Sequence, residues 1–127
     1  MSLTAPLSLG ELIDRLTILE IKTQRIATPS KRVHVRRERE ALAALAAPFL
    51  QQTPRLIGLK RRLSHVNRTL WVIETASRAR FGRAPQPPAK ASALLTRIAR
   101  LNDLRFRLKQ SISRAAGSAI IEQKSYF

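Results

Sequence analysis

The sequence predicts an all-α fold, an antiparallel bundle of about four helices with a short C-terminal tail. Apolar residues recur at three- and four-residue steps over four long stretches, which is the period of an amphipathic helix. Proline- or glycine-containing segments separate these stretches. No stretch longer than the tail alternates with the two-residue period of a strand. Because the chain has 127 residues, it has the size of one domain with one continuous core.

The first helix is expected over residues 9–27. Ser8 and Glu11 form a capping box, in which the hydroxyl accepts from a free backbone N–H and the carboxylate returns to the cap. Glu11 and Arg15 are one turn apart and can pair. Glu20 projects at the flank of the apolar stripe, whereas the other charged side chains gather on the opposite side. The apolar stripe is Leu9, Leu12, Leu16, Leu19 and Ile26, and the opposite side holds Glu11, Asp14, Arg15, Lys22 and Arg25.

The second helix is expected over residues 31–47. Ser30 is a suitable cap for its first turn, and Pro48 is expected to end it because proline cannot continue the backbone hydrogen bonds of a helix. Glu38 occupies a position of the inward stripe where an apolar residue is expected. The sequence therefore places a carboxylate toward the core. The apolar members of this stripe are Val35, Leu42, Leu45 and Phe49.

The third helix is expected over residues 55–81, after a turn that contains Pro54. A second stripe, which includes polar residues, runs beside its apolar stripe. Glu74 and Arg78 in that second stripe lie one turn apart and can pair along the helix. The apolar stripe is Leu56, Leu59, Leu63, Val66, Leu70 and Ile73, and the stripe beside it is Asn67, Trp71, Glu74 and Arg78.

The fourth helix is expected over residues 92–116, after a proline-rich loop over residues 82–91. Arg105 fills a gap in the inward apolar stripe of this helix, and Gly117 is expected to terminate it. The tail, residues 118–127, is too short to be an independent element. The apolar stripe is Leu94, Ile98, Leu101, Leu108 and Ile112, and Asn102 and Lys109 flank Arg105.

Charged side chains of four different helices are therefore expected to face the interior of the bundle. Arg105 should form an ion pair with at least one carboxylate of this layer, because a buried guanidinium without a partner is strongly destabilising. One interpretation is a structural polar layer that fixes the register of the helices, and the other is a small-molecule or anion site between them. The acids expected near Arg105 are Glu20, Glu38 and Glu74, and Asn67, Arg78, Asn102 and Lys109 complete the candidate layer.

The formal net charge of +16 is the strongest feature of the composition. Residues 1–64 hold 12 basic and 5 acidic groups, a net charge of +7, and residues 65–127 hold 12 and 3, a net charge of +9. Such a surface favours polyanions, so a nucleic-acid backbone and an acidic protein are possible partners. Aromatic residues make up only 5%, which argues against a base-stacking platform, and no sequence-reading motif is present. The candidate phosphate contacts are Arg61, Arg62 and Arg68.

The residue patterns of most catalytic and metal sites are missing. The sequence has no cysteine, no paired-histidine spacing and no glycine-rich phosphate loop, so it predicts no metal and no cofactor and names no catalytic residue. No apolar run reaches the length of a membrane span, and the N-terminus lacks the regions of a signal peptide. These features fit a cytoplasmic protein and favour a function other than catalysis.

Five blocks of the sequence resemble a family of small bacterial proteins of unknown function. The opening block is GELIDRLTILEIK at residues 10–22. The later blocks follow in the family's order: VRRE at residues 35–38, LW and IE within 70–74, ND, Arg and Lys within 102–109, and Glu followed by KSY within 122–126. The resemblance implies a helical domain and no established activity, cofactor or catalytic residue. It also makes Lys124, Ser125 and Tyr126 a candidate partner-binding tail.

The sequence departs from that family's pattern in two places. His34 stands where the family has Asn before the VRRE block, and residues 75–77 replace an expected acid and an Ile-Arg pair. The second difference argues against a ligand site near the end of the third helix that this chain would share with the family.

Three functional interpretations follow from these observations. The first is a basic helical interaction or adaptor domain, with a homodimer possible. The second is weak nucleic-acid binding through the basic face, without sequence preference. The third is a small-anion binder or a helical enzyme similar to the all-helical chorismate mutases, which also begin with a long helix and bind a dianion with Arg, Lys and Glu or Gln. Arg105 is the one arginine that the sequence places inward for such a role.

Overall fold

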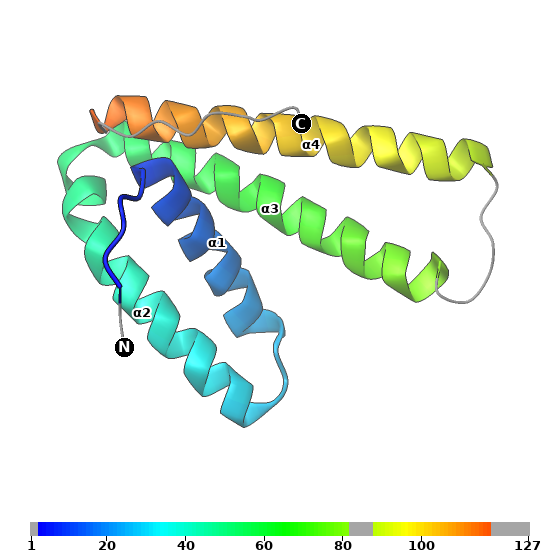
Figure 1. Cartoon of the computed structure of the whole chain (residues 1–127), viewed down its shortest axis with the longest axis horizontal. Helices are drawn as coiled ribbons and strands as arrows, with labels where there is room; N and C mark the ends of the chain where they lie inside the picture. The colour runs from blue at the N-terminus through cyan, green and yellow to red at the C-terminus, as the bar shows by residue number, and fades with distance from the viewer. Residues whose placement is uncertain (1–2, 82–87, 118–127) are drawn as a thin grey trace.

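A computed structural model of the chain describes residues 3–81 and 88–117. Within these ranges it contains four α-helices and no strand, so the predicted all-α bundle is confirmed (Figure 1). No helix in the described ranges is both long enough and apolar enough to cross a lipid bilayer. The helices are α1 (Leu9–Arg25), α2 (Pro29–Gln52), α3 (Pro54–Phe81) and α4 (Pro88–Ala115).

The helices form two hairpins, α1 with α2 and α3 with α4, which are set obliquely to each other (Figure 1). α1 contacts all three other helices, whereas α2 contacts α1 and α3. The α3–α4 hairpin continues past α1, so its far half lies outside the part of the bundle where three helices meet (Figure 1). α3 also contacts all three other helices, so α1 and α3 together form the centre of the fold.

α1 is buried on two sides because it packs against three neighbours. The expected apolar stripe is buried except for Ile26, which is partly buried. Asp14, from the side that was expected to face solvent, and Thr17 are buried as well. Asp14 is 1% exposed and Thr17 is 0% exposed. The prediction that Asp14 lies on an outer face is therefore wrong. The buried residues of α1 are Leu9, Gly10, Leu12, Ile13, Asp14, Leu16, Thr17, Leu19 and Ile21.

α2 differs from its predicted form at both ends. It begins at Pro29, whose fixed φ suits the first turn of a helix, so Ser30 lies inside the helix and does not cap it. It also continues through Pro48 to Gln52. Pro48 and Ala44 are both exposed, so water can reach the Ala44 carbonyl that loses its intrahelical donor.

The face that α2 turns to the bundle is rotated from the predicted one. Ala46 is its one buried residue, and Arg39 is more buried than Glu38, which is exposed. Leu45 and Phe49 are also exposed, at 60% and 42%. Glu38 thus does not face the core. The observed contact stripe is Val35, Arg39, Leu42, Ala46 and Leu50, so Arg39, Ala46 and Leu50 take the places predicted for Glu38, Leu45 and Phe49.

α3 carries its expected stripe inward, with Leu56, Leu59, Leu63, Val66, Leu70 and Ile73 all buried. In α4 only the end near α1 is fully covered, with Leu108 and Ile112 buried, whereas Leu94, Ile98 and Leu101 are partly buried. α4 begins at Pro88, four residues before the predicted start, and its end at Ala115 is one residue short of the prediction. Residues 82–87 of the expected loop and the tail 118–127 lie outside the described residues.

Gly10 lets the first turn of α1 touch the backbone of α4. The Gly10 N–H donates to Ser113 Oγ at 2.9 Å. A Cβ atom on Gly10 would lie 2.1 Å from the Lys109 carbonyl oxygen and 2.9 Å from Ser113 Oγ. No side chain fits into this contact, so glycine sets how closely α1 and α4 approach.

We predict that Gly10→Ala destabilises the protein by about 3 kcal/mol, the upper end of the usual cost of overpacking, because a backbone atom must move. Gly58→Ala is the matched control. Nothing lies within 4 Å of a Cβ at Gly58, so that change should stabilise α3 by about 1 kcal/mol. Urea unfolding followed by circular dichroism measures both, and equal effects of the two changes would contradict the close contact.

Candidate functional site

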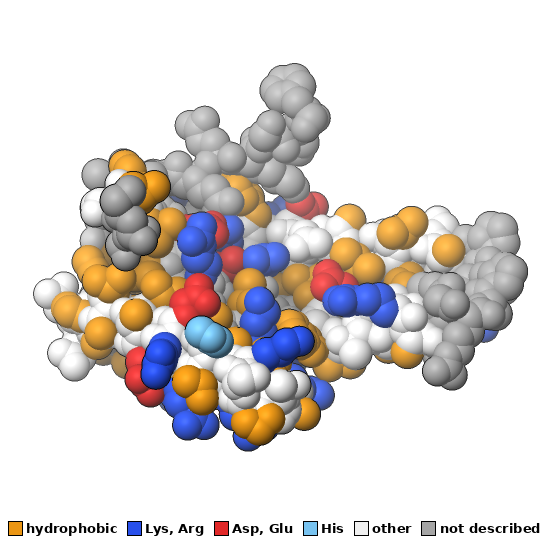
Figure 2. Space-filling view, turned by 60° about the horizontal axis from the view of Figure 1, so that its bottom comes forward, with side chains coloured by type: hydrophobic (Ala, Val, Ile, Leu, Met, Phe, Trp, Pro, Cys, Tyr) orange, Lys and Arg blue, Asp and Glu red, His pale blue; other side chains and the backbone are white. Residues whose placement is uncertain are grey.

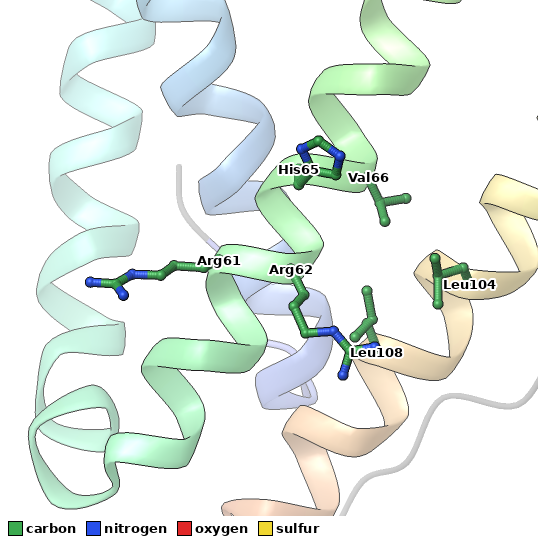
Figure 3. Close-up of a pocket in the computed structure, with 6 residues that line it drawn as sticks. All are labelled: Arg61, Arg62, His65, Val66, Leu104 and Leu108. Carbon is green, nitrogen blue, oxygen red and sulfur yellow. The ribbon is translucent and has the colours of Figure 1, made fainter.

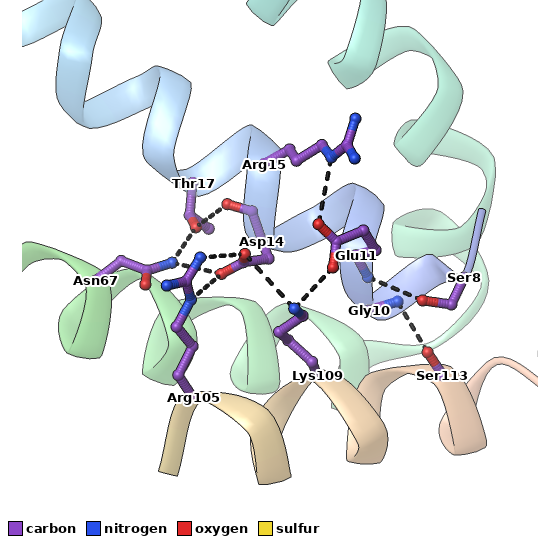
Figure 4. Close-up of polar contacts among 10 residues, drawn as sticks. All are labelled: Ser8, Gly10, Glu11, Asp14, Arg15, Thr17, Asn67, Arg105, Lys109 and Ser113. Atoms are coloured by element: carbon purple, nitrogen blue, oxygen red, sulfur yellow. Dashed lines mark hydrogen bonds and ion pairs between the residues drawn. The ribbon is translucent and has the colours of Figure 1, made fainter. Parts of the chain in front are cut away.

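The carboxylate of Asp14 is the centre of a polar cluster between α1, α3 and α4 (Figure 4). Its side chain is 2% exposed. Asp14 Oδ1 accepts from Arg105 Nε at 2.9 Å, and Asp14 Oδ2 accepts from Arg105 Nη2 at 2.6 Å. This two-pronged ion pair is the strong, planar arrangement that arginine forms with carboxylates, and it joins α1 to α4.

Asn67 joins α3 to the same carboxylate. Its Nδ2 donates to Asp14 Oδ1 at 2.9 Å and lies 2.8 Å from Thr17 Oγ1, which accepts its second hydrogen. The Thr17 hydroxyl in turn donates to the Asp14 backbone carbonyl at 2.7 Å. These bonds supply partners for the polar groups that α1 and α3 bury against each other.

Lys109 and Glu11 extend the cluster toward the start of α1. Lys109 Nζ lies 2.7 Å from Glu11 Oε2 and 3.9 Å from Asp14 Oδ2. Glu11 Oε1 also accepts from Arg15 Nε at 3.3 Å, so the predicted pair of Glu11 and Arg15 is confirmed. Only half of the predicted capping box forms. Ser8 Oγ accepts from the Glu11 N–H at 3.1 Å, while the Glu11 carboxylate turns to the two cations.

The pKa of Glu11 records this environment. Burial acts to raise the pKa, but the hydrogen bond and the charge of Lys109, together with the hydrogen bond from Arg15, outweigh burial and the nearby negative charge of Asp14. The pKa of the Glu11 carboxyl therefore lies below its ordinary value of 4.5.

The predicted partners of Arg105 are wrong. Arg105 does lie at an inward position, but its acid is Asp14. Glu20 pairs with Lys60 at 2.9 Å on the flank of α1. Glu38 and Glu74 are both exposed, Glu38 because the face of α2 is rotated and Glu74 because its part of α3 lies beyond α1.

The remaining candidates of the polar layer divide into two groups. Asn67 and Lys109 belong to the cluster. Asn102 and Arg78 are exposed, and Arg78 forms no ion pair with Glu74 among the described residues. The tail candidates Lys124, Ser125 and Tyr126 lie outside the described residues.

Sequence reasoning missed Asp14, although a signal for it exists. Gly10, Ile13, Thr17 and Ile21 recur at three- and four-residue steps and form a second stripe of small or apolar residues on α1. Asp14 lies beside that stripe. Two adjoining stripes indicate a helix with neighbours on two sides, and a charge at the outer edge of the second stripe can lie within reach of the second neighbour.

The cluster has the properties of a structural layer. Two carboxylates, Asp14 and Glu11, face two cations, Arg105 and Lys109, and the described contacts satisfy both oxygens of each carboxylate. An anion that entered would meet the charge of Asp14. The described residues also hold no group of three His, Asp or Glu side chains that could bind a metal ion.

A second candidate site lies on the outside, where α3 and α4 run side by side. Two adjoining hollows there have volumes of about 300 and 360 Å³, and His65 lines both. We call them together the α3–α4 groove. Its floor is Val66 and Ile73 from α3 and Leu104 and Leu108 from α4, and its rim includes Arg62, His65, Arg68, Val72 and Arg97.

Arginines surround this apolar floor. Figure 3 shows the Arg62 side chain reaching across toward Leu108 on α4, while Arg61 points away from it. None of the described lining residues is acidic. A third hollow of about 190 Å³ adjoins the groove on α3 and is lined by Arg61, Ser64, His65 and Arg68. All three candidate phosphate contacts thus lie near His65: Arg61 and Arg68 share the third hollow with it, and Arg62 shares the groove with it.

On the face of the molecule that Figure 2 shows, Lys and Arg side chains are scattered among apolar ones and are not gathered in one patch.

Comparison with known proteins adds no family assignment, because no family model, no curated protein and no solved structure matches the chain.

We predict that Arg105→Met lowers the free energy of unfolding by about 3 kcal/mol, the low end for a broken buried pair, because 29% of the Arg105 side chain is exposed. Adding Asp14→Asn removes the unpaired charge and keeps an acceptor for Asn67, so the double variant should recover more than half of the loss. Arg15→Met is the control, since it removes an exposed pair worth less than about 1 kcal/mol. Equal unfolding midpoints for Arg105→Met and the parent would refute the structural interpretation.

We also predict that Glu11 makes stability depend on pH in the acid range. Because folding lowers the pKa of Glu11, its contribution is complete above its unfolded value and is lost as the pH falls through the folded value. Glu11→Gln should therefore be less stable than the parent at neutral pH, with the difference shrinking as the pH falls below about 5. The exposed Glu40 supplies the control Glu40→Gln. A parent-to-variant difference that stays constant over this range would contradict the assignment.

Proposed function

We propose that this chain is a non-enzymatic interaction domain that binds an acidic partner protein through the α3–α4 groove. The observation that carries the proposal is the contrast between the two candidate sites. In the cluster around Asp14, the described charges neutralise one another across the helices. In the groove, Arg62, Arg68 and Arg97 border an apolar floor, and the described ion pairs include none of the three.

Charge and apolar surface together favour a protein partner. Covering the apolar floor favours binding only if the ligand brings apolar side chains of its own. The arginines favour carboxylates, with which their planar side chains form paired hydrogen bonds. A partner with both features uses the whole surface of the groove.

Nucleic-acid binding is the second candidate, and the hollow on α3 favours it. Arg61 and Arg68 lie seven residues apart on one face of α3, with Ser64 and His65 between them. Four donors around one hollow suit a phosphate, and the net charge of +16 would add affinity without sequence preference.

The small-anion or enzyme interpretation has less support. The inward cations Arg105 and Lys109 already hold Asp14 and Glu11. A dianion at this position would have to displace these carboxylates, which the fold uses to join α1 to α4.

The experiment compares two variants with the same net charge. Arg62→Glu/Arg68→Glu/Arg97→Glu reverses three charges of the groove, and Lys31→Glu/Arg36→Glu/Arg37→Glu reverses three exposed charges of α2. We expect the groove variant to bind fluorescent poly-L-glutamate at least about tenfold more weakly than the α2 variant at low salt, because only contacts made at the groove depend on where the charges lie.

Two outcomes would contradict the proposal. Equal weakening by both variants would mean that the total charge of the protein, and not the groove, binds acids. A random duplex DNA that binds more tightly than poly-L-glutamate and is released by the groove variant would favour the nucleic-acid function instead. Circular dichroism of each variant confirms that the helices are intact.

A further inference from the structure

The geometry points to a specific form of partner: we propose that the α3–α4 groove binds an acidic amphipathic α-helix of another protein, about three turns long. This inference rests on the proposed function and specifies its ligand. The occupant lies along the groove with its apolar stripe on the floor and carboxylates on both flanks of that stripe. Such helix-in-groove binding uses anchors at helical spacing.

The length follows from the lining of the groove. On α3 the lining runs from Arg61 to Ile73, and on α4 it runs from Leu108 back to Arg97. At 1.5 Å per residue, twelve helical steps span roughly 18 Å. A ligand helix of about 12 residues, or about three turns, covers this distance.

The floor has the character of a helix-binding surface. Val66, Ile73, Leu104 and Leu108 come from two helices packed side by side, so their side chains leave a shallow furrow between two ridges. Val72 adds an apolar side chain at the rim and is 50% exposed. A third helix laid in this furrow would bury Val72 and Leu104, and its own side chains would fill the two hollows.

Cations flank the furrow on both sides. On the α3 edge is Arg68, with Arg62 closer to the floor. On the α4 edge is Arg97, and Arg100 and Arg107 fall on the same side of α4 at helical spacing and are exposed. The two rows of positive charge require carboxylates on both flanks of the ligand's apolar stripe.

The other forms of acidic ligand use this surface less well. The described chain has no strand whose edge could pair with an extended peptide. A nucleic-acid duplex presents phosphates but no apolar stripe, so it would leave the floor of the groove in contact with water. An amphipathic helix satisfies the floor and both rows of cations at once.

The experiment uses the full chain and two labelled peptides of identical composition. The first, about 16 residues long so that a helix can form, has leucines at helical spacing and glutamates on both flanks. The second has the same residues in an order that spreads the leucines around the helix. We expect the first peptide to bind at least about tenfold more tightly in fluorescence anisotropy and to gain helical circular dichroism on binding.

Two single variants test whether the floor takes part. Val72→Ser removes an apolar side chain at the groove, and Val33→Ser removes one of similar exposure, 46%, from α2. Val72→Ser should weaken the amphipathic peptide about fivefold, as expected for the loss of about 1 kcal/mol of apolar contact. Val33→Ser should leave its affinity within about twofold of the parent.

The outcomes separate this inference from the function on which it rests. Equal affinity of the two peptides, both weakened by the groove charge reversal, would overturn the helical ligand and leave an acidic-protein function in place. Peptide binding that the groove charge reversal does not weaken more than the α2 reversal would overturn both. A duplex DNA that binds more tightly than the amphipathic peptide and competes with it for the groove would assign the surface to nucleic acid.

Discussion

The ion pair of Asp14 and Arg105 is the interaction on which the rest of the structure depends. Asp14 is almost fully buried in α1, which contacts all three other helices. Its charge is tolerated there because Arg105 comes from α4 and Asn67 from α3 to hold both oxygens. A buried carboxylate permits few alternative packings, since any shift of α1 would leave it without donors. Together with the close contact at Gly10, this pair fixes where α1 lies on the α3–α4 hairpin.

Positive charge has two different surroundings in this molecule, the interior polar cluster and the exterior surface. The interior cations Arg105 and Lys109 neutralise the acids of α1. The exterior arginines have few acids near them, since the chain holds 24 basic and 8 acidic residues and two of those acids are committed to the cluster. α1 contacts α3 and α4 at Asn67 and Arg105, and the neighbouring Val66 and Leu104 line the α3–α4 groove on another face of the two helices. The groove therefore combines accessible apolar side chains with exterior arginines.

The sequence predicted the helices better than their surroundings. The period of the leucines located all four helices, and the inward stripe of α3 was correct at every position. Periodicity assigns one inward face to each helix, however, and α1 has two, so Asp14 was placed outside. The rotated face of α2 has a related cause: Leu45 and Phe49 are apolar and still exposed, and the residues that decide this lie on other helices. Pro48 was a misleading stop because an exposed proline can remain within a helix.

A nitrogen-15 NMR titration of the full chain with the acidic amphipathic peptide tests most directly whether the groove binds the acidic helix while the polar cluster stays intact. It observes the groove and the polar cluster in one experiment. We expect backbone signals to shift along residues 61–73 and 97–108, while the side-chain signals of Asn67 and of Arg105 Nε keep their positions. Large shifts of these two side chains, with little change along the groove, would contradict this expectation, because the peptide's carboxylates would then be bound by the cluster that holds the fold together.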